Sequence, residues 1–528
     1  MTRPWTPGRD RRAVRHPGAA GALRSSTGES ASVLVLGGGI AGLAAATGLA
    51  ERGVAVTLVE KCEQLGGRVR AWPVQHADRS AGVTTLTMSR GFHAFFRQYY
   101  NLRALLRRAD PLLESLTAVA DYPLVLAGGH TDSFATIPTT PPLNMAAFVA
   151  RSPSFALSDL AAVDIAAALE LLDVEFPATF SAYDGESASE FLDRLHFPDA
   201  ARHLALEVFA RSFFAQPTDF SAGELVAMFH TYFLGSSEGL LFDVPVDDYD
   251  TVLWAPLGRY LHGLGVTVLT GRSVDRLTVE ADDPGAPVRV LLEDGEVLTA
   301  DAVVVATDFA TTRSLVAGSP GPADPAWRER VAETRAAPRF AVWRLWLDRL
   351  VDAGRPAFLG TSGYGPLDNV TVLERFEAGA RSWSAEHGGS VVEVHAYALP
   401  DDADEATVRE RLRAELGRVY PETLAAGVVA QEWLVMDDCP LVGTGPWRRR
   451  PEVVTPDSRV VLAGDGVRCD YPVALMERAA TTGFLAANAL LGKWGLAGHE
   501  VWTVPMASRH PVAGILRSGA KRLQMLAR

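Results

Sequence analysis

The clearest pattern of apolar positions lies near the beginning of the chain, at residues 32–60. Residues 33–36 are an unbroken run of Val and Leu, which is typical of a strand buried on both faces of a parallel sheet. A glycine-rich turn follows, then an Ala-rich helical stretch (43–52) and a second β-branched run (54–59). The spacing of apolar residues changes from that of a strand to that of a helix and back, which predicts a strand–turn–helix–strand unit. The charge-free stretch 32–50 is about as long as a membrane span, but this unit explains it better. We therefore expect no transmembrane segment there.

Alternating and helical patterns continue along the rest of the chain. Residues 288–305 alternate on either side of Asp294-Gly295, which predicts a β-hairpin. Residues 405–419 have helical spacing of apolar positions and end before Pro421. Further strands are expected at 265–270, 303–307, 340–347, 391–397 and 459–463, and further helices at 157–172, 200–214 and 474–491.

The glycine-rich turn carries the first chemical signal. Gly37, Gly39 and Gly42 fit the spacing GxGxxG between a strand and a helix. In such a turn the first glycine permits a tight bend, the second lets backbone approach a pyrophosphate, and the third lets the helix pack closely. The helix N-terminus offers free N–H groups to phosphate, and Glu60 is spaced to accept the ribose hydroxyls. The unit predicts a dinucleotide site, and FAD and NAD both stay open at this point.

Later segments resemble those of the glutathione-reductase-like flavoproteins, in the same order. The turn at 66–68 is similar to the one that brings backbone and a cation near the pyrophosphate, and Val274 to the valine that contacts adenine. Gly464 and Asp465 are similar to the motif whose Asp holds the ribityl chain or pyrophosphate, and Met476 lies in a helix that points at the flavin ring. The resemblance implies FAD, bound by Gly37, Gly39, Gly42, Glu60, Gly67, Arg68, Val274, Gly464, Asp465 and Met476.

These flavin segments are dispersed, which predicts that a substrate domain is inserted between them. We expect an α/β fold: a glutathione-reductase-like, Rossmann-type FAD-binding domain with a discontinuous α+β substrate domain. No second strand–GxGxxG–helix unit occurs, so electrons are expected to leave for an external acceptor, oxygen or a quinone. The expected parts are a disordered basic tail at 1–31, an FAD-binding domain at 32–100, 250–325 and 430–492, a substrate-binding domain at 101–249 and 326–429, and a basic amphipathic C-terminal segment at 493–528.

Composition and charge limit the kinds of partner and cofactor that the chain is expected to bind. The chain has 528 residues, too many for one hydrophobic core, and its formal net charge of −13 argues against nucleic acid. Its three cysteines form no CxxC pair and no His cluster has metal spacing, so we expect no metal, no disulfide and a cytoplasmic location. Both ends are basic; the apolar residues interleaved at the C-terminal end fit either a plain terminal helix or peripheral contact with a membrane surface.

An unusually aromatic segment occupies residues 90–102. Taken singly, its residues are best explained as core packing under the flavin domain. As a set they match GxHxFFxxYxN, a signature that carotenoid desaturases carry after the Gly-Gly-Arg turn. Together with residues 471–479, the segment resembles more closely still the isorenieratene synthases, which are carotenoid β-ring desaturase/methyltransferases, also called φ-ring synthases. This resemblance extends over residues 32–492.

The resemblance implies a reaction. A β-ring of β-carotene becomes an aromatic φ-ring after two desaturations and the shift of one methyl from C1 to C2, with no S-adenosylmethionine. A cation formed by loss of hydride to the flavin would draw the methyl across, and aromatic faces stabilise a cation without attacking it. The resemblance places Phe95, Phe96 and Tyr99 in that lining and His93 as the base. Because a carotene dissolves in lipid, we expect peripheral contact with a membrane.

Other functions for the same fold stay open. A linear-carotene desaturase would share most of these motifs. An amine oxidase usually needs a lysine beside the flavin, and the chain contains only Lys61, Lys493 and Lys521. An escort protein that binds a prenyl chain without catalysis would be expected to lose its flavin motifs, whereas Glu60 and Arg68 are in place.

Overall fold

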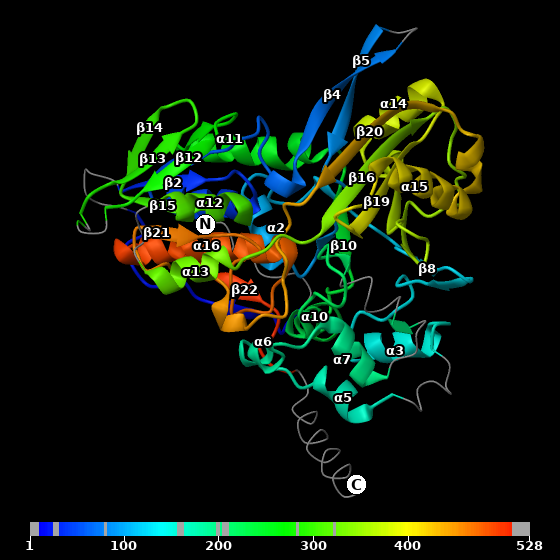
Figure 1. The fold of residues 1–528 in the computed structure, drawn as a ribbon, viewed down its shortest axis with the longest axis horizontal. Coiled ribbons are helices and arrows are strands. Elements are labelled where there is room, and N and C mark those ends of the chain that lie inside the picture. Colours follow the sequence, from blue (N-terminus) through cyan, green and yellow to red (C-terminus); the bar gives the residue numbers. More distant parts are fainter. Residues whose placement is uncertain are drawn as a thin grey trace, which may run out of the picture.

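A parallel sheet forms one side of the molecule, on the left in Figure 1. The computed structural model describes residues 10–24, 31–78, 82–155, 163–196, 201–202, 211–280, 283, 285–319 and 324–508. All four strand pairings of this sheet are parallel, and its strands are almost entirely apolar because both faces are covered. The strand order is β11 (Thr267–Leu269), β3 (Ala55–Val59), β2 (Ser32–Leu36), β15 (Ala302–Val305) and β21 (Val460–Leu462).

Helix α1 (Ile40–Ala50) follows β2 and is buried along its whole length against α16 (Leu475–Lys493). Glycines allow the two helices to approach: a Cβ on Gly483 would lie 2.3 Å from the carbonyl oxygen of Ala41. The strand–turn–helix–strand unit expected from the sequence is confirmed, and it explains the charge-free stretch 32–50 without a membrane span.

The predicted hairpin is present as β13 (Val288–Leu292) and β14 (Val297–Ala300), and β12 (Val274–Thr278) extends it to three antiparallel strands. The hairpin is shorter than predicted. Residues 302–305 leave it and enter the parallel sheet as β15, because the run Ala302–Val305 is buried throughout and pairs with β2 and β21.

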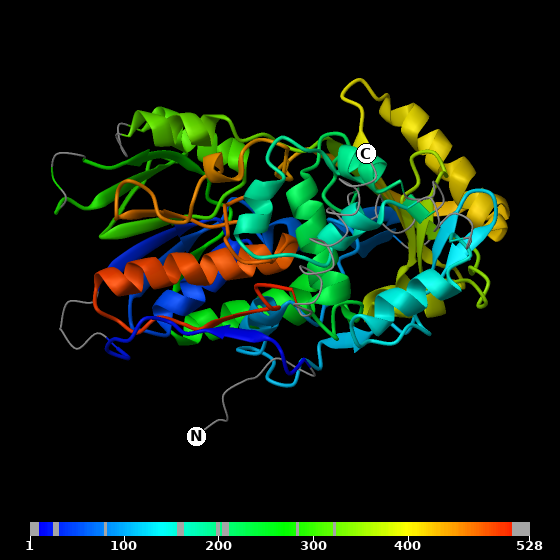
Figure 2. The ribbon, with the colours of Figure 1, turned by 90° about the horizontal axis from the view of Figure 1, so that it is seen from below.

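A seven-stranded sheet forms the other side, on the right in Figure 1, and Figure 2 shows the same separation from below. Helix α15 (Glu405–Val419) packs on it through Val408, Leu412 and Leu416. The pairings are antiparallel except between β17 and β8. The order is β20 (Val428–Met436), β16 (Arg339–Leu347), β19 (Val391–Leu399), β18 (Asn369–Val372), β17 (Phe358–Ser362), β8 (Leu124–Leu126) and β9 (His130–Asp132).

The remaining elements connect the two sheets or surround them. In Figure 1 a two-stranded ribbon projects upward beside the seven-stranded sheet, and a group of short helices lies below that sheet. Their bounds are β4 (Ala71–Asp78), β5 (Gly82–Ser89), β6 (Phe95–Phe96), β7 (Leu116–Ala118), β10 (Phe242–Pro245), α2 (Tyr100–Leu106), α3 (Leu143–Arg151), α5 (Ile165–Glu170), α6 (Ala178–Ala182), α7 (Ala188–Leu195), α10 (Ala222–Phe229), α11 (Ala255–Gly263), α12 (Phe309–Gly318), α13 (Pro325–Ala332), α14 (Ala378–His387), and the single turns η1 (Gly67–Val69), η3 (His230–Leu234), η4 (Asp250–Trp254), η5 (Leu373–Arg375), η6 (Pro421–Ala425) and η7 (Trp447–Arg449).

Two sequence-based boundaries differ from the structure. The FAD-binding domain was expected to resume at residue 430, but β20 (Val428–Met436) is an edge strand of the seven-stranded sheet, because its residues pair in register with β16. The helix expected at 157–172 is represented by α5 (Ile165–Glu170), and residues 156–162 lie outside the described part. Most of the helix expected at 200–214 also lies outside it.

The expectation of a disordered tail at 1–31 is wrong for its middle part. Strand β1 (Val14–His16) pairs antiparallel with β22 (Val501–Thr503), and Asp10 accepts a 3.1 Å hydrogen bond from the backbone N–H of Ser237. A partner strand almost 500 residues away satisfies the backbone of β1, so local composition gave no sign of it. Residues 1–9, 25–30 and the predicted terminal amphipathic segment after residue 508 lie outside the described residues.

Candidate flavin and substrate site

The glycine turn lies at the carboxyl end of β2, where α1 begins. Gly37 has a φ of +104°, and a Cβ there would lie 2.5 Å from the carbonyl oxygen of Ala306. A Cβ on Gly42 would lie 1.9 Å from the carbonyl oxygen of Gly37, so α1 can pack on the turn only with glycine there. Gly39 is open by contrast, because the nearest atom to its Cβ position is Gly67 Cα at 3.7 Å. Gly37 and Gly39 line a cavity with bare backbone, whereas Gly42 does not reach it.

Glu60 follows β3 beside this turn. Its Oε2 accepts a 2.6 Å hydrogen bond from the N–H of Gly38, and its Oε1 accepts a 2.9 Å bond from the N–H of Cys62. The side chain is buried at one end of the cavity, which Val274, the first residue of β12, also lines. A carboxylate oxygen can accept two hydrogen bonds, so both oxygens keep capacity for the hydroxyls of a ribose.

Arg68 and Asp465 join two of the expected flavin segments through a bidentate ion pair, with bonds of 2.9 and 2.5 Å. Arg90 and Asp438 form a second such pair on the same wall, with bonds of 2.8 and 2.5 Å. Gly464 precedes Asp465, and the nearest atom to its Cβ position is a side-chain carbon of Val467 at 3.9 Å. Because each guanidinium is neutralised by its own carboxylate, a pyrophosphate here would depend on backbone N–H groups of the glycine turn and of the α1 N-terminus.

The first turn of α16 lines the cavity through Met476 and is anchored from behind by Glu477. Glu477 accepts hydrogen bonds of 2.8 Å from both the backbone N–H and the side-chain Nδ2 of Asn101, and one of 2.9 Å from the N–H of Leu102. Burial raises the pKa of Glu477 to about 8, although these bonds act in the opposite direction. Asn101, the last residue of the aromatic signature, therefore fixes α16 against the N-terminus of α2.

One continuous cavity of about 890 Å³ joins this nucleotide side to an aromatic chamber. Phe92 stacks on Phe358 with ring centroids 4.4 Å apart, and Phe96 contacts Phe242 at 5.2 Å. Contacts of this kind form a nearly continuous apolar wall. We define the aromatic chamber by Phe92, Phe96, Tyr99, Tyr122, Phe134, Phe242 and Phe358.

Phe95 and Phe96 were both expected to line the substrate site, but their side chains point to opposite sides in the structure. Phe96 lines the chamber, but Phe95 is fully buried on the other side and approaches Tyr249 instead. The expectation that Phe95 lines the site is therefore corrected: both residues belong to β6, and neighbouring side chains of a strand point to opposite faces. Tyr99 lines the chamber, and its hydroxyl lies 2.6 Å from that of Tyr232.

His93 lies on the cavity wall with one ring nitrogen already engaged. Its Nδ1 donates a 2.8 Å hydrogen bond to the carbonyl oxygen of Gly91, and Nε2 has no hydrogen-bond partner among the described residues. Burial lowers the pKa of His93 to about 4, so the ring is neutral near pH 7. The arrangement leaves a free lone pair on Nε2.

A polar wall faces the same cavity, and the sequence did not predict it. Asp368 accepts a hydrogen bond from the N–H of Tyr397 (2.6 Å) and forms an ion pair with Arg211, while burial raises the pKa of Asp368 to about 6. Asn369 Nδ2 donates to the Tyr397 hydroxyl at 2.9 Å, and that hydroxyl lies 2.7 Å from His395 Nδ1. We call these five residues, Arg211, Asp368, Asn369, His395 and Tyr397, the polar wall.

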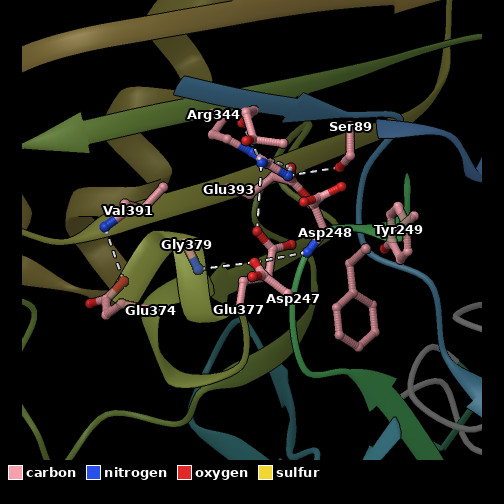
Figure 3. A network of polar contacts seen from close by, with 12 residues as sticks. Ser89, Asp247, Asp248, Tyr249, Arg344, Glu374, Glu377, Gly379, Val391 and Glu393 are labelled. Atoms are coloured by element: carbon pink, nitrogen blue, oxygen red, sulfur yellow. Dashed lines mark hydrogen bonds and ion pairs between the residues drawn. The ribbon is translucent and has the colours of Figure 1, made fainter. Parts of the chain in front are cut away.

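Behind the polar wall lies a buried ionic network (Figure 3). Arg344 donates hydrogen bonds of 3.0 and 2.7 Å to Glu393 and one of 2.7 Å to Ser89, and it lies 3.8 Å from Glu377. Although burial opposes ionisation, Arg344 and His395 lower the pKa of Glu393 to about 2. Burial raises the pKa of Glu377 to about 7, so Glu377 is partly protonated near neutral pH whereas Glu393 is ionised.

The chain is similar to known proteins over most of its length. Residues 40–491 match the family described as flavin containing amine oxidoreductase. The chain belongs to this flavin-containing amine oxidoreductase family. It is accordingly an FAD-dependent oxidoreductase, and the predicted α/β flavoprotein fold is confirmed.

Several members of this family and relatives of the chain are similar over nearly its whole length. The carotenoid phi-ring synthase of Streptomyces griseus is 54% identical over 507 residues, which are 96% of each chain. That of Chlorobaculum tepidum is 26% identical over 589 residues, covering 90% of each. The structure of cyclohexylamine oxidase from Brevibacterium oxydans has the same fold, with a TM-score of 0.61 and 15% identity over 88% of this chain and 100% of that chain.

The nucleotide side of this flavoprotein fits FAD on its own geometry. Gly39 and Gly464 leave open space where a Cβ would stand, and Glu60 keeps acceptor capacity. Lys61 lines the nucleotide end of the cavity, and its Nζ lies 3.4 Å from a carboxylate oxygen of Asp308. It is the only lysine among the described residues that line the cavity. No lysine of the described part therefore faces the aromatic chamber.

The residues that the sequence analysis missed lie mainly on β18 and β19. A signal existed in β19, where Glu393, His395 and Tyr397 alternate with apolar residues and so share one face of the strand. No local pattern indicated that this face would meet the flavin domain. Among the helices that the structure describes, none combines the length and apolar character needed to cross a bilayer.

Proposed function

We propose that this flavoprotein desaturates the β-ring of β-carotene and moves one methyl from C1 to C2, which gives an aromatic φ-ring of the isorenieratene type. The observation that carries the proposal is the single cavity in which the nucleotide side opens directly into an aromatic chamber. The 54% identity with the carotenoid phi-ring synthase of Streptomyces griseus supports the same substrate class.

For the cofactor, we assign FAD to the nucleotide side of the cavity. Gly37, Gly39 and Gly67 would present backbone to the pyrophosphate, Glu60 would bind the ribose, and Val274 would contact the adenine. Gly464, Asp465 and Arg68, which line the same cavity, would bind the ribityl chain, and Met476 in the first turn of α16 would contact the flavin ring. Bound FAD would supply hydride acceptance from an allylic ring carbon.

For the substrate, the aromatic chamber excludes water and offers ring faces to positive charge on the carotenoid ring. Phe96 and Tyr99 are the expected lining residues that reach the cavity. His93 can hold a proton at Nε2, because its Nδ1–H is fixed on Gly91 and the free lone pair points away from that bond.

The partners of the reaction follow from its chemistry. The substrate dissolves in lipid, so we propose that the protein meets the membrane peripherally on the cytoplasmic side, helped by its basic ends. The acceptor that removes electrons from the reduced cofactor would be oxygen or a quinone. Phospholipid vesicles loaded with β-carotene would test this contact by co-sedimentation.

Three other functions compete with this proposal. An amine oxidase is disfavoured by the absence of lysine on the described wall of the aromatic chamber, and a catalytically silent prenyl escort by the complete nucleotide side. A linear-carotene desaturase would act on an acyclic carotene and would move no methyl group.

Expression in a host that accumulates β-carotene separates these functions. The proposal expects a pigment that has lost four hydrogens per modified ring with its carbon number unchanged. Unchanged β-carotene would refute it, and conversion of a linear carotene instead would favour the desaturase. A flavin absorption spectrum of the purified protein would exclude the escort.

A further inference from the structure

Among the described residues, the cavity wall carries two histidines, His93 and His395, and Glu393 lies behind His395. The ring of His93 donates a hydrogen bond to the carbonyl oxygen of Gly91. The ring of His395 lies between the Tyr397 hydroxyl, 2.7 Å from Nδ1, and Glu393 Oε1, 3.0 Å from Nε2. Both histidines line the cavity, together with Tyr397.

The contacts of His395 select one tautomer. Glu393 is an ionised acceptor held by two hydrogen bonds from Arg344, and its Oε1 lies closer to His395 Nε2 (3.0 Å) than the N–H of Phe92 does (3.3 Å), so we assign the proton to Nε2. Nδ1 then holds the lone pair that accepts the Tyr397 O–H. The Tyr397 oxygen in turn accepts from Asn369 Nδ2 at 2.9 Å. All proton positions between the cavity and Glu393 are therefore aligned in one direction.

The aromatic signature is shaped around His395. Gly91 has a φ of +101°, and a Cβ there would lie 2.6 Å from Cε1 of the His395 ring. The backbone N–H of Phe92 approaches Nε2 to 3.3 Å, a longer contact than that of Glu393 Oε1 at 3.0 Å, and Ser89 shares Arg344 with Glu393. The glycine of the signature thus admits the ring of a histidine that lies 304 positions later in the sequence.

The proposed reaction requires more than one proton acceptor. A ring that loses four hydrogens in two two-electron oxidations releases two hydrides and two protons. His93 can take one proton on Nε2. We propose that Tyr397, His395 and Glu393 form a second, separate proton-accepting relay for the carotenoid ring, an inference that rests on the proposed function.

The step balances without a further reactant. As a C–H bond of the cationic ring breaks, its electron pair forms the new C=C bond and the proton goes to the Tyr397 oxygen. The phenolic proton passes to His395 Nδ1, which leaves an imidazolium paired with the Glu393 carboxylate. Tyr397 is the catalytic residue of the relay, whereas Glu393 is a positioning residue that acts through His395.

The substitution Tyr397→Phe removes the phenolic oxygen from the relay and keeps the aromatic side chain. In the β-carotene host we expect this variant to form the φ-ring at least about 100-fold more slowly, the contribution typical of a positioned acid or base, and to accumulate a ring that has lost two hydrogens. Its flavin content should match wild type. Tyr420→Phe is the matched control, because the Tyr420 hydroxyl binds Pro356 away from the cavity.

A second measurement does not depend on turnover. In 15N NMR of histidine-labelled holoenzyme, His395 should show the Nε2–H tautomer, and Glu393→Gln should change that signal. Wild-type rates in Tyr397→Phe, or an Nδ1–H tautomer, would overturn the relay. These outcomes leave the proposed function standing, whereas a wild-type enzyme that forms no φ-ring removes both.

Discussion

Glu60 lies between the glycine turn and the proposed cofactor site. Its two oxygens hold the N–H groups of Gly38 and Cys62 and face the cavity end. Glu60→Gln replaces one acceptor oxygen by a donor, so a ribose hydroxyl bond is lost. We expect FAD affinity to fall about tenfold, equivalent to ~1.4 kcal/mol, measured by flavin absorbance after dialysis.

Glu63→Gln is the matched control for this change. Glu63 is exposed and lies next to Gly271 outside the cavity. Its replacement should leave flavin content unchanged. Equal retention in both variants would contradict the role assigned to Glu60.

Glu377 predicts a pH dependence of stability. Its pKa in the folded chain is about 7, above the ordinary 4.5, chiefly because burial disfavours the charge. The unfolded chain therefore ionises first, and the resulting destabilisation is absent below pH 4.5 and complete above pH 7. Glu377→Gln should stabilise the protein relative to wild type by about 1–3 kcal/mol at pH 8 and by much less at pH 5. Denaturant unfolding at both pH values measures it; a difference independent of pH would contradict the assignment.

The sequence predicted individual residues only where one local motif fixes their surroundings. Gly37, Gly39 and Glu60 belong to such a motif, and they meet at one cavity edge. Phe95 and Phe96 could not be told apart, because the strand that sends them to opposite faces has only two residues. His395 needed knowledge of a neighbour 304 positions away.

Among the elements, α16 depends most on a single outside residue. Asn101 binds Glu477 and Thr481 of α16 with its Nδ2, and its Oδ1 accepts from the N–H of Trp502 beside β1. Asn101→Ala leaves a buried carboxylate and a backbone N–H with fewer partners. We expect a loss of about 2–3 kcal/mol in unfolding free energy, measured by chemical denaturation.

Asn488→Ala offers a comparison for that variant. Asn488 also bridges to backbone, at both the N–H and the carbonyl of His499, but it contacts no buried carboxylate. Its loss should be smaller. A larger loss than in Asn101→Ala would show that backbone bridging, rather than Glu477, dominates.

Elements that have a clear helical or strand spacing of apolar residues were predicted well. The sequence places α15 at 405–419, as the structure does, because Asp404 caps it and Pro421 follows its end. Strand β20 was assigned to the wrong domain because a run of apolar residues does not reveal which sheet it joins. Pairing with β16 decides that, and pairing is a property of the tertiary fold.

At the scale of the whole molecule, β1 tests whether the N-terminal region contributes to the fold. Deletion of residues 1–16 removes the partner of β22, which also carries Trp502 and its bond to Asn101. We expect an unfolding free energy lower by about 2 kcal/mol or more and faster proteolysis near residue 501. Deletion of residues 1–9 is the control, since it leaves β1 intact; equal stability of the two deletions would contradict this role.

The global arrangement was predictable in outline because dispersed flavin motifs require inserted segments. The sequence could not show which residues of the inserted segments contact the flavin domain, for example the hydrogen bond from Arg344 to Ser89. Such contacts join segments that carry no shared local pattern.

Antiparallel pairing of β1 with β22 also brings the two ends of the described chain beside each other. A short Gly/Ser linker from residue 508 to residue 10 would therefore have little distance to span. The polypeptide could then be opened at a surface turn such as Asp294-Gly295. A circularly permuted enzyme of this kind would keep its cavity and would have its new termini at the turn between β13 and β14.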